Sequence, residues 1–445
     1  MTQRQEHELI TGDIDRREFM SRTLMAGLGM AGVAACLGTR PAHAARSLTP
    51  IFFQWIKDLN PGIQLINARF PGMEYKIAPV EGFGIERFIA EGRNGKSTWD
   101  LYVGQTPFVD MIPLIEADVI EPWDSYIPKE VLDDIIPSIR EECSVDGKLY
   151  SWPFTLDMIA LGWHSGIIDR AGISVHPETW DDYLRLAQTV IDSGAAPFGA
   201  TFDAHGWRSL APFAHSLSSD VYTAEGLFNF THEASVEALI LMKKIMAVSH
   251  PDVLLPGSGG DSGYSSTPDE MAFAAQRVGY YTKYFSASLR MARYWDDPDE
   301  VALGILPKFA GGEGSTVFWT TGCGLLKHGQ NKELAAEYIR TLTYDPQIWR
   351  DSIVGTEAGR PGGLPPYMSI YAEWAANPPA WLPDYVDLVR GQLNQARAIE
   401  NHLFGLQQFN IGQPLWETYL KGEEQNPRVA LQNAVAAVRA EMKRG

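Results

Sequence analysis

The sequence has few cysteines, fewer basic than acidic residues, and, after its N-terminal segment, no hydrophobic run long enough for a membrane span. Its 445 residues include 3 cysteines, which excludes a disulfide-rich framework. The 37 Lys and Arg residues against 55 Asp and Glu residues give a formal net charge of −18. Nucleic acids and anionic lipid surfaces both require a basic patch, so this balance argues against either partner.

The N-terminal segment has the pattern of an export signal. The pair Arg16-Arg17, with Phe19 two positions later, precedes an uncharged Gly- and Ala-rich run over residues 24–37, and Ala42-His43-Ala44 then offers a small-x-small cleavage site. We predict a twin-arginine-type signal over residues 1–44 and a periplasmic location for the rest of the chain. This segment carries five basic and five acidic side chains, so its removal leaves the charge at −18.

The cysteines leave two questions open. Val33-Ala34-Ala35-Cys36 resembles a lipobox, so a lipid anchor through Cys36 is the alternative to cleavage after Ala44. Cys143 and Cys323 stand alone in the sequence. In an oxidising compartment the two can form a disulfide, or they can remain buried free thiols.

The first part of the exported chain alternates between strands and helices. Apolar runs predict strands over residues 51–56, 75–80 and 99–103, and amphipathic spacing predicts helices over 61–70 and 84–91. This rhythm is typical of a parallel α/β sheet. Further along, the patterns predict an Asp146-Gly147 hairpin turn and helices over 177–191 with Thr179 as N-cap, 231–246, 331–342 with Asn331 as N-cap, and from Pro427 onward.

Motifs of catalysis, metal binding and nucleotide binding are lacking. The 10 histidines form no HExxH pattern, and no P-loop or GxGxxG follows a predicted strand. The Gly257–Gly263 stretch has no strand-turn-helix context, so we interpret it as a polar surface loop. We predict no enzymatic activity, no metal and no cofactor.

Several segments, taken in order, resemble family 1 of the extracellular solute-binding proteins of ABC importers, the sugar-binding group that includes maltose-binding protein. The resemblance covers nearly all of residues 48–445. The segments that carry it are Pro61–Val80, Trp99–Val103, Leu114–Trp123, Asp146–Pro153, Leu161–His164, Ala171–Asp182 and Asn331–Glu337. Trp163-His164 and Phe318–Cys323 depart from the family pattern and leave the ligand, but not the family, in question.

The resemblance implies an α/β, two-lobed periplasmic binding protein fold of type II (Venus-flytrap), with interleaved lobes and hinge crossings. It implies that residues 45–157 and 322–362 form lobe 1 and that residues 158–321 and 363–445 form lobe 2. The implied hinges lie near residues 153–157, 320–324 and 362–365. The ligand then binds in the cleft between the lobes.

A sugar site needs aromatic faces for stacking and amide, carboxylate or Arg groups for hydrogen bonds. Candidates are side chains at strand ends, in loops and at the implied hinges. They are Trp55, Gln105, Asp157, Asp203, Trp207, Arg208, Tyr281, Tyr284, Trp319, Thr320, Arg360 and Trp416. For Trp55 simple core packing is an equal alternative, and for Asp157 the alternative is a hydrogen bond within the hinge.

We therefore predict a monomeric substrate-binding component that captures a sugar or oligosaccharide and delivers it to an inner-membrane ABC permease. Two alternatives remain open: a non-sugar polar solute such as a polyamine or amino-acid derivative, and an exported carbohydrate-active enzyme. The mixture of Arg, Gln and Trp candidates favours a neutral polyol over a cation.

Overall fold

The computed structural model describes residues 48–52, 66, 70, 76–77, 85–255, 267–350, 363–378 and 391–444. These residues belong to one compact unit that begins at Arg46. The predicted export signal, the predicted helix 61–70 except Ile66 and Phe70, Trp55, Arg360 and the Gly257–Gly263 loop lie outside the described residues. Within the described part, no helix combines the length and the apolar character needed to cross a membrane.

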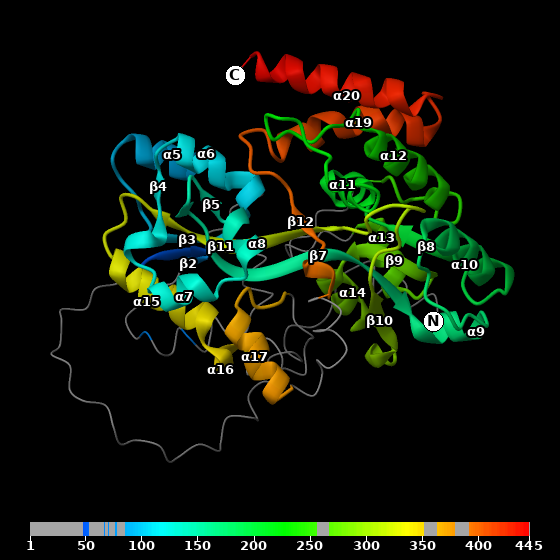
Figure 1. The fold of residues 1–445 in the computed structure, drawn as a ribbon, viewed down its shortest axis with the longest axis horizontal. Helices are drawn as coiled ribbons and strands as arrows, with labels where there is room; N and C mark the ends of the chain where they lie inside the picture. Colours follow the sequence, from blue (N-terminus) through cyan, green and yellow to red (C-terminus); the bar gives the residue numbers. More distant parts are fainter. Residues whose placement is uncertain are drawn as a thin grey trace. The chain divides into compact units, whose positions relative to one another are not determined.

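The described strands form one mixed sheet and a small hairpin (Figure 1). They are β1 (Pro50–Phe52), β2 (Lys76–Ile77), β3 (Leu101–Gln105), β4 (Ile120–Glu121), β5 (Ser144–Val145), β6 (Lys148–Leu149), β7 (Trp152–His164), β8 (Phe198–Phe202), β9 (Val278–Tyr284), β10 (Val301–Gly304), β11 (Val317–Leu326) and β12 (Arg397–Ala398).

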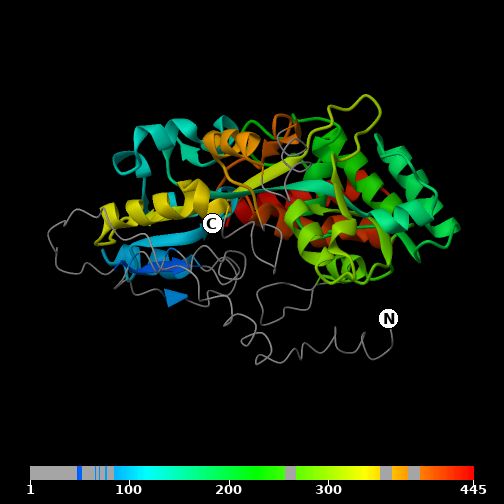
Figure 2. The same cartoon turned by 90° about the horizontal axis from the view of Figure 1, so that it is seen from below.

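Helices cover the sheet on both faces. They are α5 (Glu86–Arg93), the π-helix η1 (Pro107–Met111), α6 (Ile112–Glu116), α7 (Lys129–Asp134), α8 (Pro137–Glu142), α9 (Ser165–Arg170), α10 (Trp180–Asp192), α11 (Trp207–His215), α12 (Glu233–Met246), α13 (Pro268–Ala274), α14 (Phe285–Ala292), α15 (Lys332–Tyr344), α16 (Pro346–Ile348), α17 (Met368–Ala376), α19 (Gln407–Lys421) and α20 (Pro427–Met442). Figures 1 and 2 place α19 and α20 next to each other and beside α12.

The main path through the sheet runs β2-β1-β3-β11-β7-β9-β8. β1 is parallel to both β2 and β3, as the strand-helix rhythm predicts, whereas β11 is antiparallel to β3 and to β7. On the other side, β8 is parallel to β9, and β9 is antiparallel to β7. The α/β class is thus confirmed, in a sheet of mixed direction.

One strand is shared by the two lobes. The first half of β7 pairs with β11, from Trp152 opposite Cys323 to Met158 opposite Phe318. Its second half pairs with β9 and β10. A bridge between Leu156 and Leu364 adds the third segment, with both backbone N–H···O distances at 2.8 Å. The three implied hinge segments therefore lie side by side across β7.

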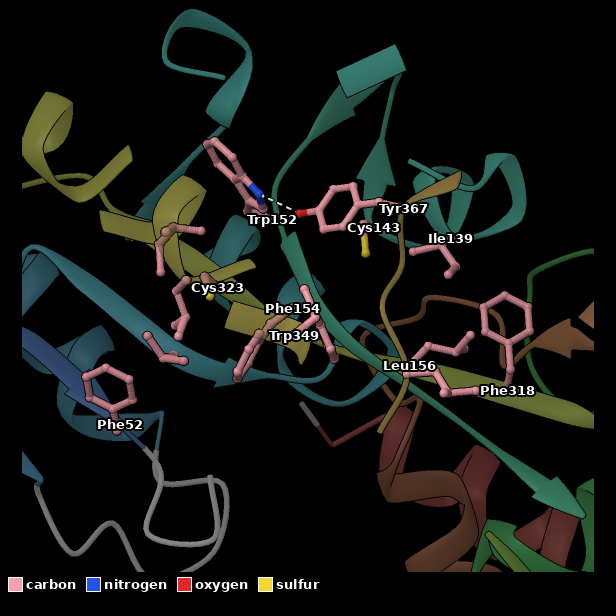
Figure 3. Close-up of a cluster of buried hydrophobic side chains, with 14 of the residues drawn as sticks. Phe52, Ile139, Cys143, Trp152, Phe154, Leu156, Phe318, Cys323, Trp349 and Tyr367 are labelled. Carbon is pink, nitrogen blue, oxygen red and sulfur yellow. Dashed lines mark hydrogen bonds between the residues drawn. The ribbon is translucent and has the colours of Figure 1, made fainter. Parts of the chain in front are cut away.

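After residue 363 the described chain contacts elements that the resemblance assigns to lobe 1. The Trp152 indole donates to the Tyr367 hydroxyl at 2.8 Å (Figure 3), and Asp134 accepts from the Ser369 backbone N–H at 3.0 Å. These two contacts tie Tyr367 and the start of α17 to β7 and α7.

Local signals are confirmed where they were strongest. Asp146 and Gly147 have φ of 50° and 74°, as a tight hairpin turn between β5 and β6 requires. The Thr179 hydroxyl accepts from the Asp182 backbone N–H at 3.1 Å and caps α10. Asn331 precedes α15 but its side chain makes no capping bond there. Cys143 and Cys323 are both buried and free, which settles the choice between a disulfide and two thiols in favour of the thiols.

Candidate ligand-binding site

Four aromatic rings from four elements meet beside the shared strand. Trp319 on β11 lies 4.8 Å from Trp207 at the start of α11, and 5.7 Å from Tyr284 at the end of β9, as measured between ring centroids. Phe108 of η1 lies 5.1 Å from Trp207. Each pair is edge-to-face, so the cluster presents ring faces in several directions. Trp319 and Tyr284 are only partly buried. The sequence predicted Trp207, Trp319 and Tyr284 for the site but missed Phe108.

A network of charged side chains adjoins this aromatic cluster at Arg208, the residue after Trp207. Asp203, which follows β8, accepts from Arg208 Nε at 2.5 Å and from the His205 backbone N–H at 3.0 Å. Its second cation is Lys283 of β9, whose Nζ lies 3.2 Å away. Burial alone would raise the pKa of Asp203, but the two cations hold it well below its usual range. Asp203 is therefore ionised near neutral pH.

Lys283 extends the network into α13. Its Nζ lies 2.8 Å from Asp269 and 3.3 Å from Glu270, and Glu270 also contacts Arg290 of α14 at 2.8 Å. Burial alone would lower the pKa of Lys283, but the three carboxylates around it raise it. The Tyr281 hydroxyl donates to Asp269 at 2.8 Å. Tyr281, predicted to contact ligand, is fully buried and lies inside this network instead of in the aromatic cluster.

Asp157 lies opposite Trp319 in the β7–β11 pairing. It accepts hydrogen bonds from the Ser286 hydroxyl and, at 2.8 Å, from the backbone N–H of Met158. Burial raises the pKa of this carboxyl to about 7, against the opposing effect of those hydrogen bonds. Ser286 and Met158 lie outside the implied hinge segments, so the ligand contact and the hinge hydrogen bond both stay predictions for Asp157.

Two further predicted residues, Thr320 on β11 and Gln105 on its neighbour β3, are buried. Thr320 is buried, and its backbone N–H and hydroxyl donate to the Glu142 carboxylate at 3.1 and 2.7 Å. Gln105, at the end of β3, is buried against Gly324, and its amide has no hydrogen-bond partner within the described part. Burial raises the pKa of Glu142 to about 8. Thr320 and Gln105 thus contact Glu142 of α8 and Gly324 of β11, and neither belongs to the aromatic cluster.

Trp416 occupies a different place. It is fully buried in the core of lobe 2, where its ring lies 5.4 Å from Phe230. Its helix nevertheless reaches the site through Gln413, whose side-chain oxygen accepts from the Gly206 backbone N–H at 2.7 Å. No group of His, Cys, Asp and Glu side chains in the described ranges is arranged to hold a metal ion.

Sequence reasoning missed the residues that hold the predicted ones in place. They are Phe108, His205, Asp269, Glu270, Lys283, Ser286, Arg290 and Gln413. Lys283 alone carried a signal, since a Lys within the apolar run Val278–Tyr284 has to be paired.

Comparison with known proteins agrees with this architecture. The family model "Bacterial extracellular solute-binding protein" matches residues 59–347. The GacH receptor of Streptomyces glaucescens, solved unliganded and with acarbose, is 16% identical with a TM-score of 0.69, over 89% of this chain and 99% of that one. A binding protein for cyclic alpha-maltosyl-1,6-maltose from Arthrobacter globiformis is 19% identical with a TM-score of 0.67, over 90% and 100%. Both likenesses show the two-lobed fold.

Curated relatives match over shorter segments. A maltotriose-binding protein of Pyrococcus abyssi is 27% identical over 84 residues, which are 19% of this chain and 17% of that protein. The chain spans about a fifth of the length of the curated relatives it matches. The family model, in contrast, covers more than half of the chain, including β7, β11 and the whole aromatic cluster. The chain belongs to the bacterial extracellular solute-binding protein family.

Proposed function

We propose that this protein is the substrate-binding component of an ABC importer that captures a sugar or oligosaccharide between its lobes and delivers it to an inner-membrane permease. The observation that carries the proposal is the aromatic cluster of Phe108, Trp207, Tyr284 and Trp319 beside the strands that join the lobes. Ring faces are what the C–H faces of a sugar stack on. The acarbose and cyclomaltosyl-maltose ligands of the structural neighbours, and the name of the maltotriose-binding relative, support the same class.

The mechanism we propose is closure of the lobes about β7, β11 and the Leu364 bridge. Trp319 comes from a joining strand, while Trp207 and Tyr284 come from lobe 2. A ligand that contacts the site and the opposing lobe at once is bound more tightly by the closed form, and this difference in affinity drives closure. The closed form then docks on the permease. We propose no reaction for the protein, which we take to act as a monomer.

The export pattern over residues 1–44 supports a periplasmic site of action, with the twin-arginine pathway as the route. Cleavage after Ala44 and a lipid anchor at Cys36 are the two forms that this segment allows. Mass spectrometry of the protein purified from its native membrane and periplasmic fractions distinguishes them, because a lipidated N-terminus adds acyl mass at Cys36.

The proposal is tested by isothermal titration of the exported chain against a panel of mono- and oligosaccharides, with polyamines and amino acids as the competing class. We expect a saccharide to bind, and Trp319→Ala to weaken it by at least about tenfold, because a stacked ring contributes about 0.5–1.5 kcal/mol beyond its burial. Tyr294→Ala, which removes an exposed ring outside the cluster, is the matched control. Binding of a polyamine or amino acid in place of every sugar, or release of reducing ends from polysaccharides, overturns it.

A further inference from the structure

Beside the aromatic cluster the negatively charged side chains are buried, whereas a positively charged one is partly exposed. The side chains of the carboxylates Asp203, Asp269 and Glu270 are 0%, 0% and 4% exposed, so solvent and ligand do not reach them. Their central partner Lys283 is 2% exposed. The side chain of Arg208, in contrast, is 33% exposed. In a chain of net charge −18, the outward-facing charge at this point is therefore positive.

Arg208 is held so that one end of its guanidinium remains available. Its Nε donates to Asp203, and its guanidinium carbon lies 5.8 Å from the ring centroid of Trp207. Its two terminal nitrogens make no hydrogen bond to any of the described residues. A guanidinium anchored through Nε presents these nitrogens as a planar pair, which matches the two oxygens of a carboxylate.

The surroundings of Arg208 add to its positive potential. It lies in the first turn of α11, where the N-cap Gly206 provides no side-chain cap and no acidic residue follows in that turn. The N-terminus of a helix attracts anions. His205, 18% exposed, contacts Asp203 through Nδ1 at 3.2 Å, and its Nε2 is buried without a hydrogen-bond partner in the described part of the chain.

Resting on the proposed function, we infer that the preferred ligand is an acidic saccharide, a sugar or oligosaccharide with a uronic acid unit, whose carboxylate is bound by the terminal nitrogens of Arg208 while its ring stacks in the aromatic cluster. Arg208 then serves as the residue that determines specificity. A neutral sugar satisfies the aromatic rings equally well but offers Arg208 only hydroxyl groups, which make weaker hydrogen bonds than a carboxylate.

The test compares acid and neutral sugars of one shape by isothermal titration: galacturonic acid and its dimer against galactose and galactobiose, and glucuronic acid against glucose. We expect an acidic member to bind at least about tenfold more tightly than its neutral counterpart, from the difference between charged and neutral hydrogen bonds. Higher salt should reduce this preference, because screening acts on charge pairs and not on stacking.

Two variants locate the effect. Arg208→Gln removes the charge and should lower affinity for the acid by about tenfold to a hundredfold, while the neutral sugar loses less. Arg208→Lys keeps the charge without the planar pair and should fall between the two. Residual binding of the neutral sugar by each variant shows that the site is still folded. If Arg208→Gln binds no sugar at all, Arg208→Lys is used in its place, because it retains a cation for Asp203. A larger loss of affinity for the acid than for the neutral sugar in Arg208→Lys then supports the role of Arg208, and equal losses overturn it.

The outcomes separate this inference from the proposed function. Equal or tighter binding of the neutral member overturns the acidic preference and leaves a sugar-binding protein. Loss of acid and neutral affinity in equal proportion in Arg208→Gln overturns the role of Arg208. Failure of every saccharide on the wider panel overturns both.

Discussion

Buried carboxylates occur in two settings in this molecule, and the comparison separates its rigid part from its titratable part. In lobe 2, Asp203, Asp269 and Glu270 surround Lys283, and the cations Arg208 and Lys283 hold the pKa of Asp203 well below its usual range. Around the joining strands, other buried carboxylates rely on hydroxyl and backbone N–H donors alone. Burial raises the pKa of a carboxyl in either setting, so the neighbouring cations explain why the pKa of Asp203 is lowered where the others are raised.

The second group comprises Asp110, Glu142 and Asp157, and none of them forms an ion pair within the described ranges. Asp110 accepts from the Tyr102 hydroxyl at 2.7 Å and from the Thr106 backbone N–H at 3.2 Å. Burial raises the pKa of Asp110 and of Glu142 to about 8, and that of Asp157 to about 7. We call Asp110, Glu142 and Asp157 the unpaired carboxylates. These raised pKa values place the titration of the three carboxyls near neutral pH.

The largest effect should come from removing the shared cation. Lys283→Met leaves three buried carboxylates with too little positive charge, and breaking a buried ion pair typically costs about 3–5 kcal/mol. Thermal and urea unfolding should show a loss of at least that size. Lys129→Met is the control, because Lys129 forms only an exposed pair with Asp133 and such pairs contribute about 1 kcal/mol or less. Losses of similar size in the two variants would contradict the comparison.

Replacing a carboxylate by its isosteric amide should lower stability much more in the ion-paired setting than among the unpaired carboxylates. Asp203→Asn should destabilise the protein by about 3 kcal/mol, because it leaves Arg208 and Lys283 with a neutral partner. Glu142→Gln replaces a carboxyl that burial already favours in its neutral form, so we expect a change within about 1 kcal/mol at pH 8. Urea unfolding of both variants at one pH is the measurement. A greater loss in Glu142→Gln than in Asp203→Asn would reverse our interpretation of both sites.

A pH series tests the unpaired carboxylates directly. A raised pKa means that the native state holds a proton that the unfolded chain has released, so their stabilising effect is complete below about pH 4 and is lost as pH rises through 7 to 8. Each such group lowers the free energy of unfolding by up to about 1.4 kcal/mol per pH unit in that window. Asp110→Asn should therefore show a shallower decline between pH 5 and pH 8 than the unaltered protein. Parallel curves would rule out proton binding at Asp110.

Removing the hydroxyl that donates to Glu142 should also have a small effect on stability. Thr320→Val keeps the volume of the side chain but removes the hydroxyl that donates at 2.7 Å. A lost hydrogen bond of this kind costs about 1–3 kcal/mol, and the Thr320 backbone N–H still donates, so the lower end applies. The loss should be greater at pH 9 than at pH 6, since the hydroxyl favours the charged carboxylate. A loss independent of pH would indicate packing as its cause.

The range of the forces involved decides which features of the fold could be predicted from the sequence. The Thr179 cap and the Asp146-Gly147 turn depend on neighbours within four residues, and both are as predicted. The strand-helix rhythm up to residue 105 predicted the parallel part of the sheet. The place of α17 depends instead on the contact of Tyr367 with Trp152, more than 200 residues away, and no local pattern carries that information.

Some residues of the candidate site could likewise be predicted from local sequence, and others could not. Strand ends and loops predicted Trp207, Trp319 and Tyr284, which the fold brings together. For aromatic residues such as Trp416, however, composition does not separate a ligand face from a core, because burial depends on what the rest of the chain places over the ring. The expectation of a neutral polyol stays a prediction: it weighed residue types, whereas the inferred acidic ligand follows from which of those residues are exposed.

The sharing of β7 between the lobes also has a consequence for biosynthesis. β7 is complete at residue 164, but its partner β11 is translated some 150 residues later and ends at Leu326. The first half of β7 therefore lacks its β11 partner until about three quarters of the polypeptide has been synthesised, and its edge stays unpaired on that side during this time. Chaperone protection of the nascent chain, more than the stability of the finished protein, should then limit the yield of folded product in expression.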